Sequence, residues 1–406
     1  MRTVVLGAGY AGLTAARELA WRLGPRHPHE ILLVDRWPYH QLIIRLHEVA
    51  AASIPPEDAV VPIAHALRDR RVGFQRAVVT GLDADARRVR TDAGDIPFDL
   101  LVVALGSETR DFGIPGIREH SLPLKSLPDA MRIRRHLEAQ VVRARHERDS
   151  DRRRARLTFV VGGGGFTGAE LAGEVLDRVR DLVALHGLDE SPRVVVLEAT
   201  ERLLPGLPAD LAARAAATLA ARGAEVRTRA PVARAGPGGL VLASGEVIAA
   251  ETLLWTGGVR GAPAIAASGL PLGAGRRARV DAFLQWHGTA GIFAIGDASV
   301  VCDPRSGEPA APSAQLALQE GVHAGANLHR LLSGRPMAPF TPAAVAEVVS
   351  LGRREAIALI GRVVIQGSEA RVLKRLGYAR YLRSVGAWPP PRVDPGELSR
   401  GFGVPA

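Results

Sequence analysis

Two glycine-rich segments of the sequence have the spacing of a loop that holds the phosphates of a dinucleotide. Each follows a short apolar run, at residues 3–6 and 157–161, and each opens a stretch with helical periodicity. In such a loop the first glycine makes the tight turn, the second lets the backbone approach a pyrophosphate, and the third lets the helix pack on the strand. The free N–H groups at the start of the helix attract the phosphates. The glycines are Gly7, Gly9 and Gly12 in the first segment and Gly163, Gly165 and Gly168 in the second.

Each predicted helix leads to a strand that ends in an acid, Asp35 in the first unit and Glu198 in the second. Such an acid accepts hydrogen bonds from the ribose of the nucleotide. Both acids lie farther beyond the first glycine than the usual distance of about 20 residues. One motif alone could be an ordinary glycine-rich turn, but two copies with the same strand, helix and acid predict two dinucleotides on one chain. Glu198 disfavours a 2′-phosphate, which indicates NAD(H) rather than NADP(H) at the second site.

Three further apolar runs complete an α/β pattern. Residues 99–106 and 251–258 each predict a buried strand that ends at glycine, and residues 292–297 predict a third strand that ends at Asp297. Ligands bind at the carboxyl edge of such sheets, so we expect Asp297 there; its alternative role is a helix N-cap. The chain is therefore expected to have an α/β fold with two Rossmann-like, dinucleotide-binding domains.

The segment between the two units is rich in arginine. Residues 124–150 predict a helix that bridges the units, and the run Arg152–Arg156 follows directly. We interpret this run as the solvated end of a linker. A patch for nucleic acid or lipid is the alternative, but aromatic residues that could stack on bases are not interleaved with the arginines.

Composition narrows the chemistry further. The chain has 406 residues and a formal net charge of +10, which favours acidic partners such as phosphates and anionic lipid. Its single cysteine, Cys302, excludes redox disulfides, cysteine-based zinc sites and iron–sulfur clusters within the chain, and we predict no metal site. Apolar runs are too short for a membrane-spanning helix. The first residues predict a strand and a loop rather than a signal peptide, and a reducing compartment is expected.

Several longer strings make the sequence resemble the type II NADH:quinone dehydrogenases, a family of flavin-dependent pyridine nucleotide oxidoreductases in the glutathione-reductase superfamily. The resemblance runs from Met1 to about Ala387, and its most discriminating string is AQxAxQ at residues 314–319, which the disulfide reductases lack. The strings that carry it are HQLIIRLHEVAA at residues 40–51, GGGFTGAELAGE at 163–174, ERLLPGLP at 201–208, LLWTGGVRG at 253–261, SAQLALQEG at 313–321 and VVSLGR at 348–353.

The resemblance implies FAD and NADH as the two dinucleotides. The residues that it assigns to FAD surround the first glycine loop, the flavin and its ribityl chain: Gly7, Gly9, Tyr10, Ala11, Gly12, Asp35, Arg36, His40, Val79, Gly106, Asp297, Ala314 and Gln315. Those that it assigns to NADH surround the second loop and the nicotinamide: Gly163, Gly165, Phe166, Thr167, Gly168, Glu170, Glu198 and Gly257.

Four catalytic positions follow from the same resemblance. Gln315 and Gln319 would share one helical face and border a quinone, Lys374 would lie near the flavin and the quinone, and Glu174 would assist proton delivery. An acidic pair such as Glu170 and Glu174 is otherwise most often a solvated helix face. His47, in an apolar stretch of the sequence, is interpreted as a core histidine.

The implied function is transfer of a hydride from NADH to the flavin and then of two electrons to a quinone, without proton pumping. A soluble NADH:acceptor reductase or oxidase, and a basic flavoprotein that binds nucleic acid, are the alternatives. The second domain would be inserted in the first. The implied division is an FAD-binding domain at 1–123 and 262–340, an NADH-binding domain at 124–261, a C-terminal cap or membrane-contact region at 341–388 and a flexible tail at 389–406.

Membrane contact rests on residues 369–387, which predict a short amphipathic helix of the kind that anchors family members. A helix that only caps the flavin domain is the alternative. The expected location is cytoplasmic, peripheral on the cytoplasmic face of the membrane, with the quinone drawn from the membrane pool and an anionic lipid surface as a partner; a homodimer stays open. The sequence departs from the family at Leu105, at Ser313 and at Glu320, which replaces a second glutamine.

Overall fold

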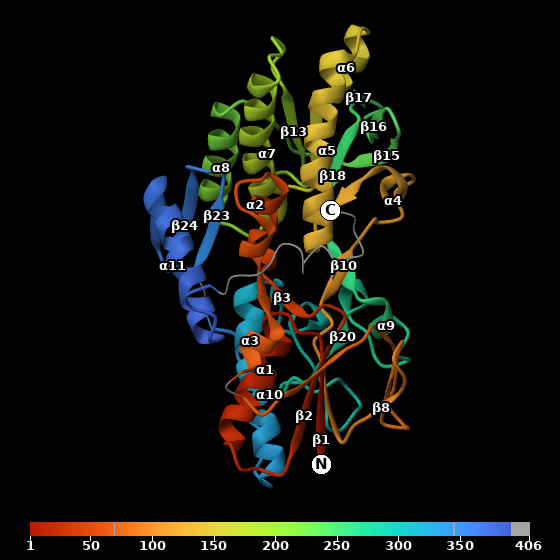
Figure 1. Cartoon of the computed structure of the whole chain (residues 1–406), viewed down its shortest axis with the longest axis vertical. Coiled ribbons are helices and arrows are strands. Elements are labelled where there is room, and N and C mark those ends of the chain that lie inside the picture. The colour runs from red at the N-terminus through yellow and green to blue at the C-terminus, as the bar shows by residue number, and fades with distance from the viewer. Residues whose placement is uncertain (69, 344–345, 391–406) are drawn as a thin grey trace.

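The computed structural model of the chain describes residues 1–68, 70–343 and 346–390. Two parallel five-stranded sheets lie one above the other along the long axis of the molecule, and the C-terminal elements pack beside them (Figure 1). This arrangement confirms the predicted α/β class with two similar units.

The first sheet has the strand order β21-β9-β1-β2-β5. Its two faces follow the alternation of side chains along each strand: Val5 and Leu33 pack beneath α1 (Tyr10–Leu23) and α10 (Ala314–Leu332), whereas Val4 packs beneath a small antiparallel sheet. The strands are β1 (Arg2–Leu6), β2 (Glu30–Asp35), β5 (Gly73–Arg76), β9 (Leu100–Val103) and β21 (Ile292–Ala294), and the small sheet is β6 (Val79–Asp83), β7 (Arg88–Thr91) and β8 (Ile96–Pro97).

The second sheet has the order β11-β18-β12-β13-β14 and the same two-sided cover. Its strands are β11 (Leu122–Pro123), β12 (Thr158–Gly162), β13 (Arg193–Leu197), β14 (Ala224–Arg227) and β18 (Thr252–Trp255). Helices α5 (Leu127–His146), α7 (Phe166–Leu185) and α8 (Ala209–Ala221) cover one face, and β15 (Val232–Gly236), β16 (Gly239–Leu242) and β17 (Val247–Ala249) cover the other. Because β11 pairs in this sheet, the second unit begins at Leu122, just before the expected boundary.

The helix predicted at 124–150 is α5, and a second short helix follows it at the arginine run. Helix α5 ends at His146, and α6 (Ser150–Arg156) starts after Asp149, whose carboxylate accepts hydrogen bonds from the N–H groups of Asp151 and Arg152. A new N-cap restarts the helix there. The arginine run, interpreted as the solvated end of a linker, thus lies in a short helix on which Arg152 and Arg154 are exposed.

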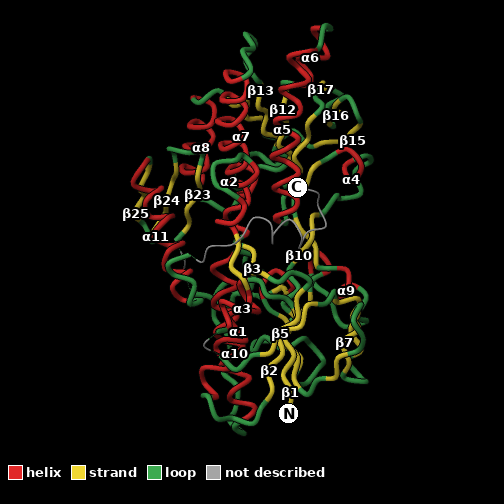
Figure 2. The backbone as a smooth tube through the Cα atoms, viewed as in Figure 1, coloured by secondary structure: helices red, strands yellow, loops and turns green. Residues whose placement is uncertain are grey.

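The chain crosses between the units twice, side by side. Strand β10 (Ser107–Thr109) leaves the first unit and pairs antiparallel with β19 (Val259–Gly261), which returns from the second (Figure 2). The short helix α4 (Ile117–His120) packs against β15 of the second unit. Other short elements line the region between the sheets or extend the first unit: β3 (Tyr39–Gln41), η1 (Ile43–Arg45), α2 (Leu46–Ala50), η2 (Pro56–Ala59), β4 (Val60–Pro62), α3 (Ile63–Leu67), α9 (Pro263–Ala266), η3 (Ala274–Arg276), β20 (Ala278–Arg279), η4 (Gly296–Ala298) and β22 (Ser299–Val300).

The C-terminal elements form a three-stranded antiparallel sheet with one helix. Strands β23 (Glu347–Ser350), β24 (Ala356–Ile360) and β25 (Val363–Gln366) are followed by α11 (Ser368–Ser384), close to the helix expected at 369–387. Within the described residues, we find no helix that is both long and apolar enough to span a membrane. The tail expected to be flexible lies, from residue 391, outside the described residues.

A glycine lets this C-terminal sheet approach α7. A Cβ on Gly173 would lie 2.3 Å from the backbone carbon of Leu351, so the segment after β23 packs directly against the helix backbone. We predict that Gly173→Ala lowers the free energy of unfolding by about 1–3 kcal/mol, because backbone on both sides resists the extra methyl group. Thermal and urea denaturation measure this loss.

Gly377→Ala is the matched control, because this glycine lies in α11 with no heavy atom within 4 Å of the added Cβ. It should gain about 0.5–1 kcal/mol from the better helix propensity of alanine. Equal effects of the two substitutions would contradict the proposed packing constraint.

Candidate functional site

The first glycine loop has the shape that a pyrophosphate requires. Gly7 has a φ of +96°, and a Cβ on Gly12 would lie 1.9 Å from the carbonyl oxygen of Gly7. A Cβ on Gly9 would meet nothing within 4 Å, so the space above this residue is open. Gly9 is also the N-cap of α1 and supplies no side-chain cap, which leaves the first N–H groups of the helix for a ligand.

The second loop repeats this geometry. Gly163 has a φ of +109°, a Cβ on Gly168 would lie 1.8 Å from the carbonyl oxygen of Gly163, and Gly165 is an open, uncapped start to α7. The helix continues from half-buried Phe166 and exposed Thr167. Each of the three glycine roles expected from the sequence is thus found twice.

The two acids also occupy equivalent positions. The Asp35 carboxylate accepts hydrogen bonds from the N–H groups of Ala8 (2.6 Å) and Trp37 (2.8 Å), and Glu198 accepts from Gly164 (2.7 Å) and Thr200 (2.8 Å). Each acid therefore holds its own glycine loop and keeps acceptor capacity for a ribose diol. The residues present fit one dinucleotide at each cradle.

Asp297 lies at the carboxyl edge of the first sheet, as expected. Its carboxylate accepts hydrogen bonds from Ser107 Oγ (2.8 Å) and from Lys125 Nζ (3.2 Å). Burial alone would raise the pKa of Asp297, but Lys125, Ser107 and Arg277 together hold it below its ordinary value. The sequence analysis did not assign Lys125; its rarity as one of two lysines was the available signal.

The two glutamines of the AQxAxQ string reach the chain that leads to β23. Gln315 Nε2 donates to the carbonyl oxygen of Ala346 (2.6 Å), and Gln319 exchanges hydrogen bonds with the backbone of Ala343, accepting from its N–H at 2.7 Å. Both side chains lie on one helical face, as predicted. They bind backbone there, which ties the start of α10 to the C-terminal sheet.

A buried ionic cluster surrounds Glu170. Its carboxylate receives hydrogen bonds from Lys374 Nζ (2.5 Å) and from the N–H and Oγ of Ser350 (3.0 and 3.1 Å), and His47 Nδ1 lies 3.7 Å away. Burial opposes ionisation, but Lys374 and His47 hold the pKa of Glu170 below its ordinary value. Burial also lowers the pKa of His47 to about 4, so this imidazole is neutral at pH 7.

Sequence reasoning paired these groups differently. It placed Glu170 beside the nicotinamide and assigned the proton-handling role to Glu174, whereas the structure brings Lys374 to Glu170 and adds His47 and Ser350. The contact between His47 and Glu170 joins segments that are far apart in the chain, so no local pattern marks it. The presence of His47 in an apolar stretch did predict its burial.

Glu174, one turn farther along α7, is fully buried. It accepts a hydrogen bond from Ser53 Oγ and lies 3.7 Å from Arg371 of α11. Burial raises the pKa of Glu174 above its ordinary value. The alternative of a solvated acidic face is therefore wrong for both glutamates, because α2, β23 and α11 pack over this side of α7.

The remaining predicted positions lie around the two cradles or in neighbouring strands. Tyr10 and His40 are buried together behind the first loop, and Arg36 lies over the Trp37 ring at 5.7 Å. Others are placed as follows: Ala11 in the first turn of α1, Val79 at the start of β6, Gly106 at the end of β9 with a φ of +69°, Gly257 against the Trp255 ring, and Ala314 as the first residue of α10.

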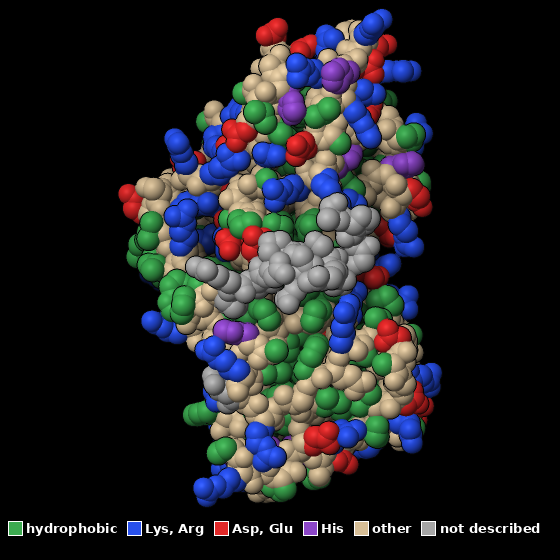
Figure 3. All heavy atoms as spheres, viewed as in Figure 1, with side chains coloured by type: hydrophobic (Ala, Val, Ile, Leu, Met, Phe, Trp, Pro, Cys, Tyr) green, Lys and Arg blue, Asp and Glu red, His purple; other side chains and the backbone are tan. Residues whose placement is uncertain are grey.

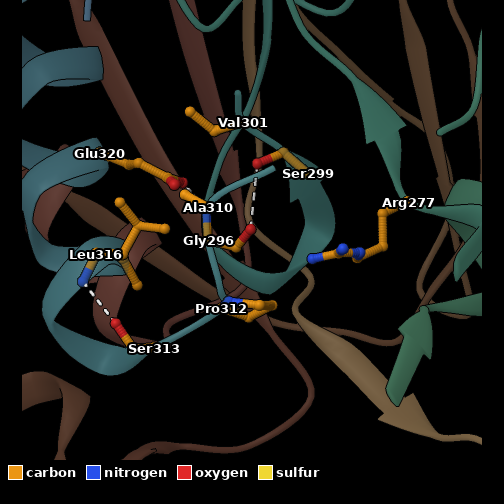
Figure 4. Close-up of a pocket in the computed structure, with 10 residues that line it drawn as sticks. Arg277, Gly296, Ser299, Val301, Ala310, Pro312, Ser313, Leu316 and Glu320 are labelled. Carbon is orange, nitrogen blue, oxygen red and sulfur yellow. Dashed lines mark hydrogen bonds between the residues drawn. The ribbon is translucent and has the colours of Figure 1, made fainter. Parts of the chain in front are cut away.

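A small cavity lies where α10 meets the loop that carries Asp297 (Figure 4). Arg277 points toward it from one side and the Glu320 carboxyl lies on the other, where Glu320 accepts a hydrogen bond from the N–H of Gly296. Burial raises the pKa of Glu320 to about 8, with a further upward contribution from Asp297. The departure from the family at this position thus places a protonated carboxyl inside the first unit at pH 7.

Comparisons with known proteins agree with this geometry. A family model described as pyridine nucleotide-disulphide oxidoreductase matches residues 1–321, and the chain belongs to that family. Within it, the chain belongs with the type II NADH:quinone oxidoreductases. It is 34% identical to the protein of that name from Staphylococcus epidermidis over 393 residues, covering 95% of this chain and 96% of the relative, and 32% identical to that from Staphylococcus aureus with the same coverage.

Solved structures show the same fold at low sequence identity. A structure of NDH2 from Plasmodium falciparum in complex with NADH superposes with a TM-score of 0.84 at 14% identity, covering 94% of each chain. The sulfide:quinone oxidoreductase of Aquifex aeolicus superposes with a TM-score of 0.77 at 18% identity, covering 95% of this chain and 91% of that one.

The buried Glu320 carboxyl predicts a specific pH dependence. Its folded-state pKa of about 8 exceeds the ordinary 4.5, so the folded protein binds the proton more tightly and its free energy of unfolding falls as pH rises through this window. Glu320→Gln keeps an acceptor for the Gly296 N–H and removes the ionisation. We expect the variant to be more stable than the parent at pH 8–9 by roughly 2–5 kcal/mol, with little difference near pH 4.

Urea denaturation of both proteins from pH 4 to pH 9 measures this difference. Glu119→Gln, an exposed carboxyl on α4, is the control and should leave the pH profile unchanged. Parallel profiles for the parent and the Glu320 variant would show that Glu320 ionises without cost.

Proposed function

We propose that this chain is an FAD-dependent NADH:quinone oxidoreductase. The observation that carries the proposal is the direct continuity of α7. This helix begins at the second glycine loop, where NADH would bind, and one turn later supplies Glu170 to the buried cluster with Lys374. One rigid helix, α7, thus contributes both to the site for the electron donor and to a second site, where Lys374 could contact the other substrate.

The two cradles divide the cofactors between the two units. The first, with Gly9, Asp35 and Asp297, would hold FAD, and the second, with Gly165 and Glu198, would hold NADH. The corresponding domains are 1–123 with 262–340 for FAD and 124–261 for NADH, with 341–388 as the C-terminal region. When bound, the flavin supplies the redox chemistry by accepting a hydride from NADH and passing two electrons to the quinone.

The protein side chains supply orientation and protons. Reduction of a quinone to a quinol consumes two protons, and Lys374 Nζ is a hydrogen-bond donor within the cluster. Glu170 and Ser350 fix the position of this ammonium group, so it can donate a hydrogen bond to a quinone oxygen in a defined direction. Gln315 and Gln319 shape the wall between α10 and the C-terminal sheet.

Two alternatives from the sequence fare differently. A soluble NADH:acceptor reductase would use the same cradles and stays open until the acceptor is tested. The nucleic-acid alternative loses its motivation, because Arg153 pairs with Glu190 at 2.5 Å and Arg156 pairs with both Glu147 and Glu251. In these pairs, two arginines of the run bind glutamates of the same chain and help to hold the local fold.

An anaerobic absorbance titration tests the proposal. NADH is added to the purified protein first and a soluble quinone second, while the flavin band is followed. The expected result is bleaching by NADH and recovery with the quinone. Bleaching without recovery would retain the NADH site and refute the quinone assignment, and absence of a flavin band would refute the enzyme proposal.

Replacement of Lys374, the cationic side chain of the cluster, should affect the quinone half-reaction and not the NADH half-reaction. In Lys374→Met we expect quinone-dependent reoxidation to slow by roughly 10²-fold, because the positioned proton donor is lost, while reduction by NADH stays within about 2-fold of the parent. Rapid-mixing absorbance gives both rates. Arg375→Met, the exposed neighbour on α11, is the control. An equal loss in both half-reactions would contradict this role for Lys374.

An exposed apolar surface on the C-terminal elements supports membrane contact. We define it by side chains at the β24–β25 hairpin and on α11: Ile360, Val363, Val364, Val372 and Leu376. Figure 3 shows hydrophobic side chains at the edge where Figure 1 places β24 and α11. Arg362, Arg375 and Arg380 are exposed in the same elements and suit an anionic lipid headgroup. We place this surface on the cytoplasmic face of the membrane; a homodimer stays a prediction.

Acidic substitutions on the outer face of α11 should release the protein from lipid. We expect the double variant Val372→Glu and Leu376→Glu to bind vesicles of 30% anionic lipid at least about 10-fold more weakly, because two exposed apolar side chains that would enter the lipid become charged. Vesicle co-sedimentation measures the binding. Val247→Glu, at an exposed valine in β17 outside this surface, is the control. Unchanged binding of the double variant would refute this surface as the contact.

A further inference from the structure

The C-terminal helix reaches the first glycine loop through a buried hydrogen-bonded chain. The Tyr381 hydroxyl of α11 lies 2.8 Å from His40 Nε2, and His40 Nδ1 lies 2.7 Å from the carbonyl oxygen of Ala8. Ala8 is inside the loop, between Gly7 and Gly9, and its N–H donates to Asp35. One chain of contacts thus runs from a helix near the end of the sequence to the backbone that would hold the FAD pyrophosphate.

The direction of each hydrogen bond in this chain follows from the chemistry of its ends. A carbonyl oxygen only accepts, so His40 Nδ1 carries the proton and donates to Ala8. The neutral ring then offers Nε2 as an acceptor, and the Tyr381 hydroxyl donates to it. Burial lowers the pKa of His40 to about 4, so this single tautomer persists through the physiological range.

Packing encloses both of these groups. His40 is fully buried and Tyr381 is 6% exposed. The Tyr10 ring, from the glycine loop itself, meets His40 edge-on with centroids 4.9 Å apart and lies 4.8 Å from the Tyr381 ring. Loss of the tyrosine hydroxyl would therefore remove the donor to a buried ring nitrogen and weaken the hold of the imidazole on Ala8.

The end of α11 is fastened to the same unit beyond this chain. The carbonyl oxygen of Gly386 lies 3.2 Å from His65 Nε2 and accepts a hydrogen bond from Arg68, and Val385 joins the core beneath α1. The earlier half of α11 carries Lys374, which pairs with Glu170 of the second unit. Helix α11 is thus docked at one end on the FAD cradle and at the other on the NADH side.

We propose that Tyr381 and His40 are positioning residues for FAD, and that docking of α11 and binding of FAD at the first glycine loop stabilise each other. This inference rests on the proposed assignment of FAD to that loop. Because coupling between two binding events is reciprocal, FAD should hold α11 in place as strongly as α11 improves FAD affinity.

Removal of one hydroxyl tests the proposal. Tyr381→Phe should bind FAD about 5- to 50-fold more weakly, the range expected when one buried hydrogen bond is lost and its partner is left unsatisfied. FAD is removed from the purified full-length protein and titrated back by fluorescence. Tyr378→Phe is the matched control on the same helix, because its hydroxyl donates to the Asp58 backbone and not to His40. The control should keep the parent affinity.

Limited trypsin digestion gives a readout that is independent of activity. Cleavage after the exposed Arg375 and Arg380 of α11 should be slowed by FAD in the parent protein, and Tyr381→Phe should lose most of this protection at an FAD concentration that saturates the parent. Cleavage after Arg148, in the loop between α5 and α6, should be the same in all proteins.

A second variant covers the case in which Tyr381→Phe does not fold. His40→Asn places an amide donor at the position of Nδ1 and should retain more FAD than His40→Leu, which has no donor for Ala8. Equal FAD affinity of the parent and Tyr381→Phe, or of the two His40 variants, would overturn the inference. A parent protein that binds no FAD would instead overturn the proposed function.

Discussion

The carboxylate of Glu170 is buried where three parts of the chain meet, and the rest of the structure must supply its counter-charge. An unpaired charge at such depth would be strongly destabilising, so Lys374 has to supply the opposite charge and Ser350 has to donate its hydrogen bonds, while the neutral His47 ring packs beside them. Lys374 and Ser350 come from α11 and β23, which are close together in the sequence, whereas His47 comes from α2, 303 residues before Ser350. One electrostatic requirement therefore fixes how the C-terminal elements sit on α7, the helix that begins at the NADH loop.

The same requirement makes the substrate regions interdependent. Gln315 and Gln319 bind the backbone that precedes β23, and Gly173 lets the chain after β23 rest directly on α7. The start of α10, the C-terminal sheet and the NADH helix consequently form one packed wall. A quinone bound against this wall would contact elements that help to hold each of the two nucleotides. The two glycine loops would not need to contact each other.

The sequence predicts most of the nucleotide geometry and little of the cluster. Gly7, Gly163, Asp35 and Glu198 were predictable because strand, glycine loop, helix and acid form a local unit whose backbone hydrogen bonds determine residue types at fixed spacing. The ion pair between Lys374 and Glu170 was not predictable from the sequence, because it depends on how α11 packs against α7. Even the burial of Glu170 and Glu174 contradicted the helix pattern, because an acidic pair at this spacing is usually exposed and only tertiary packing covers it.

The partly buried Asp297 and the buried Glu320 are neighbours in the first unit and have opposite charge states. Asp297 pairs with Lys125 and is held ionised. Burial of Glu320, with the negative Asp297 nearby, outweighs the Gly296 N–H and Arg277, so Glu320 stays protonated at pH 7. Two adjacent negative charges behind the first cradle would oppose an anionic cofactor. A glutamate that keeps its proton resolves this conflict, since it provides the acceptor that Gly296 needs while only Asp297 carries charge.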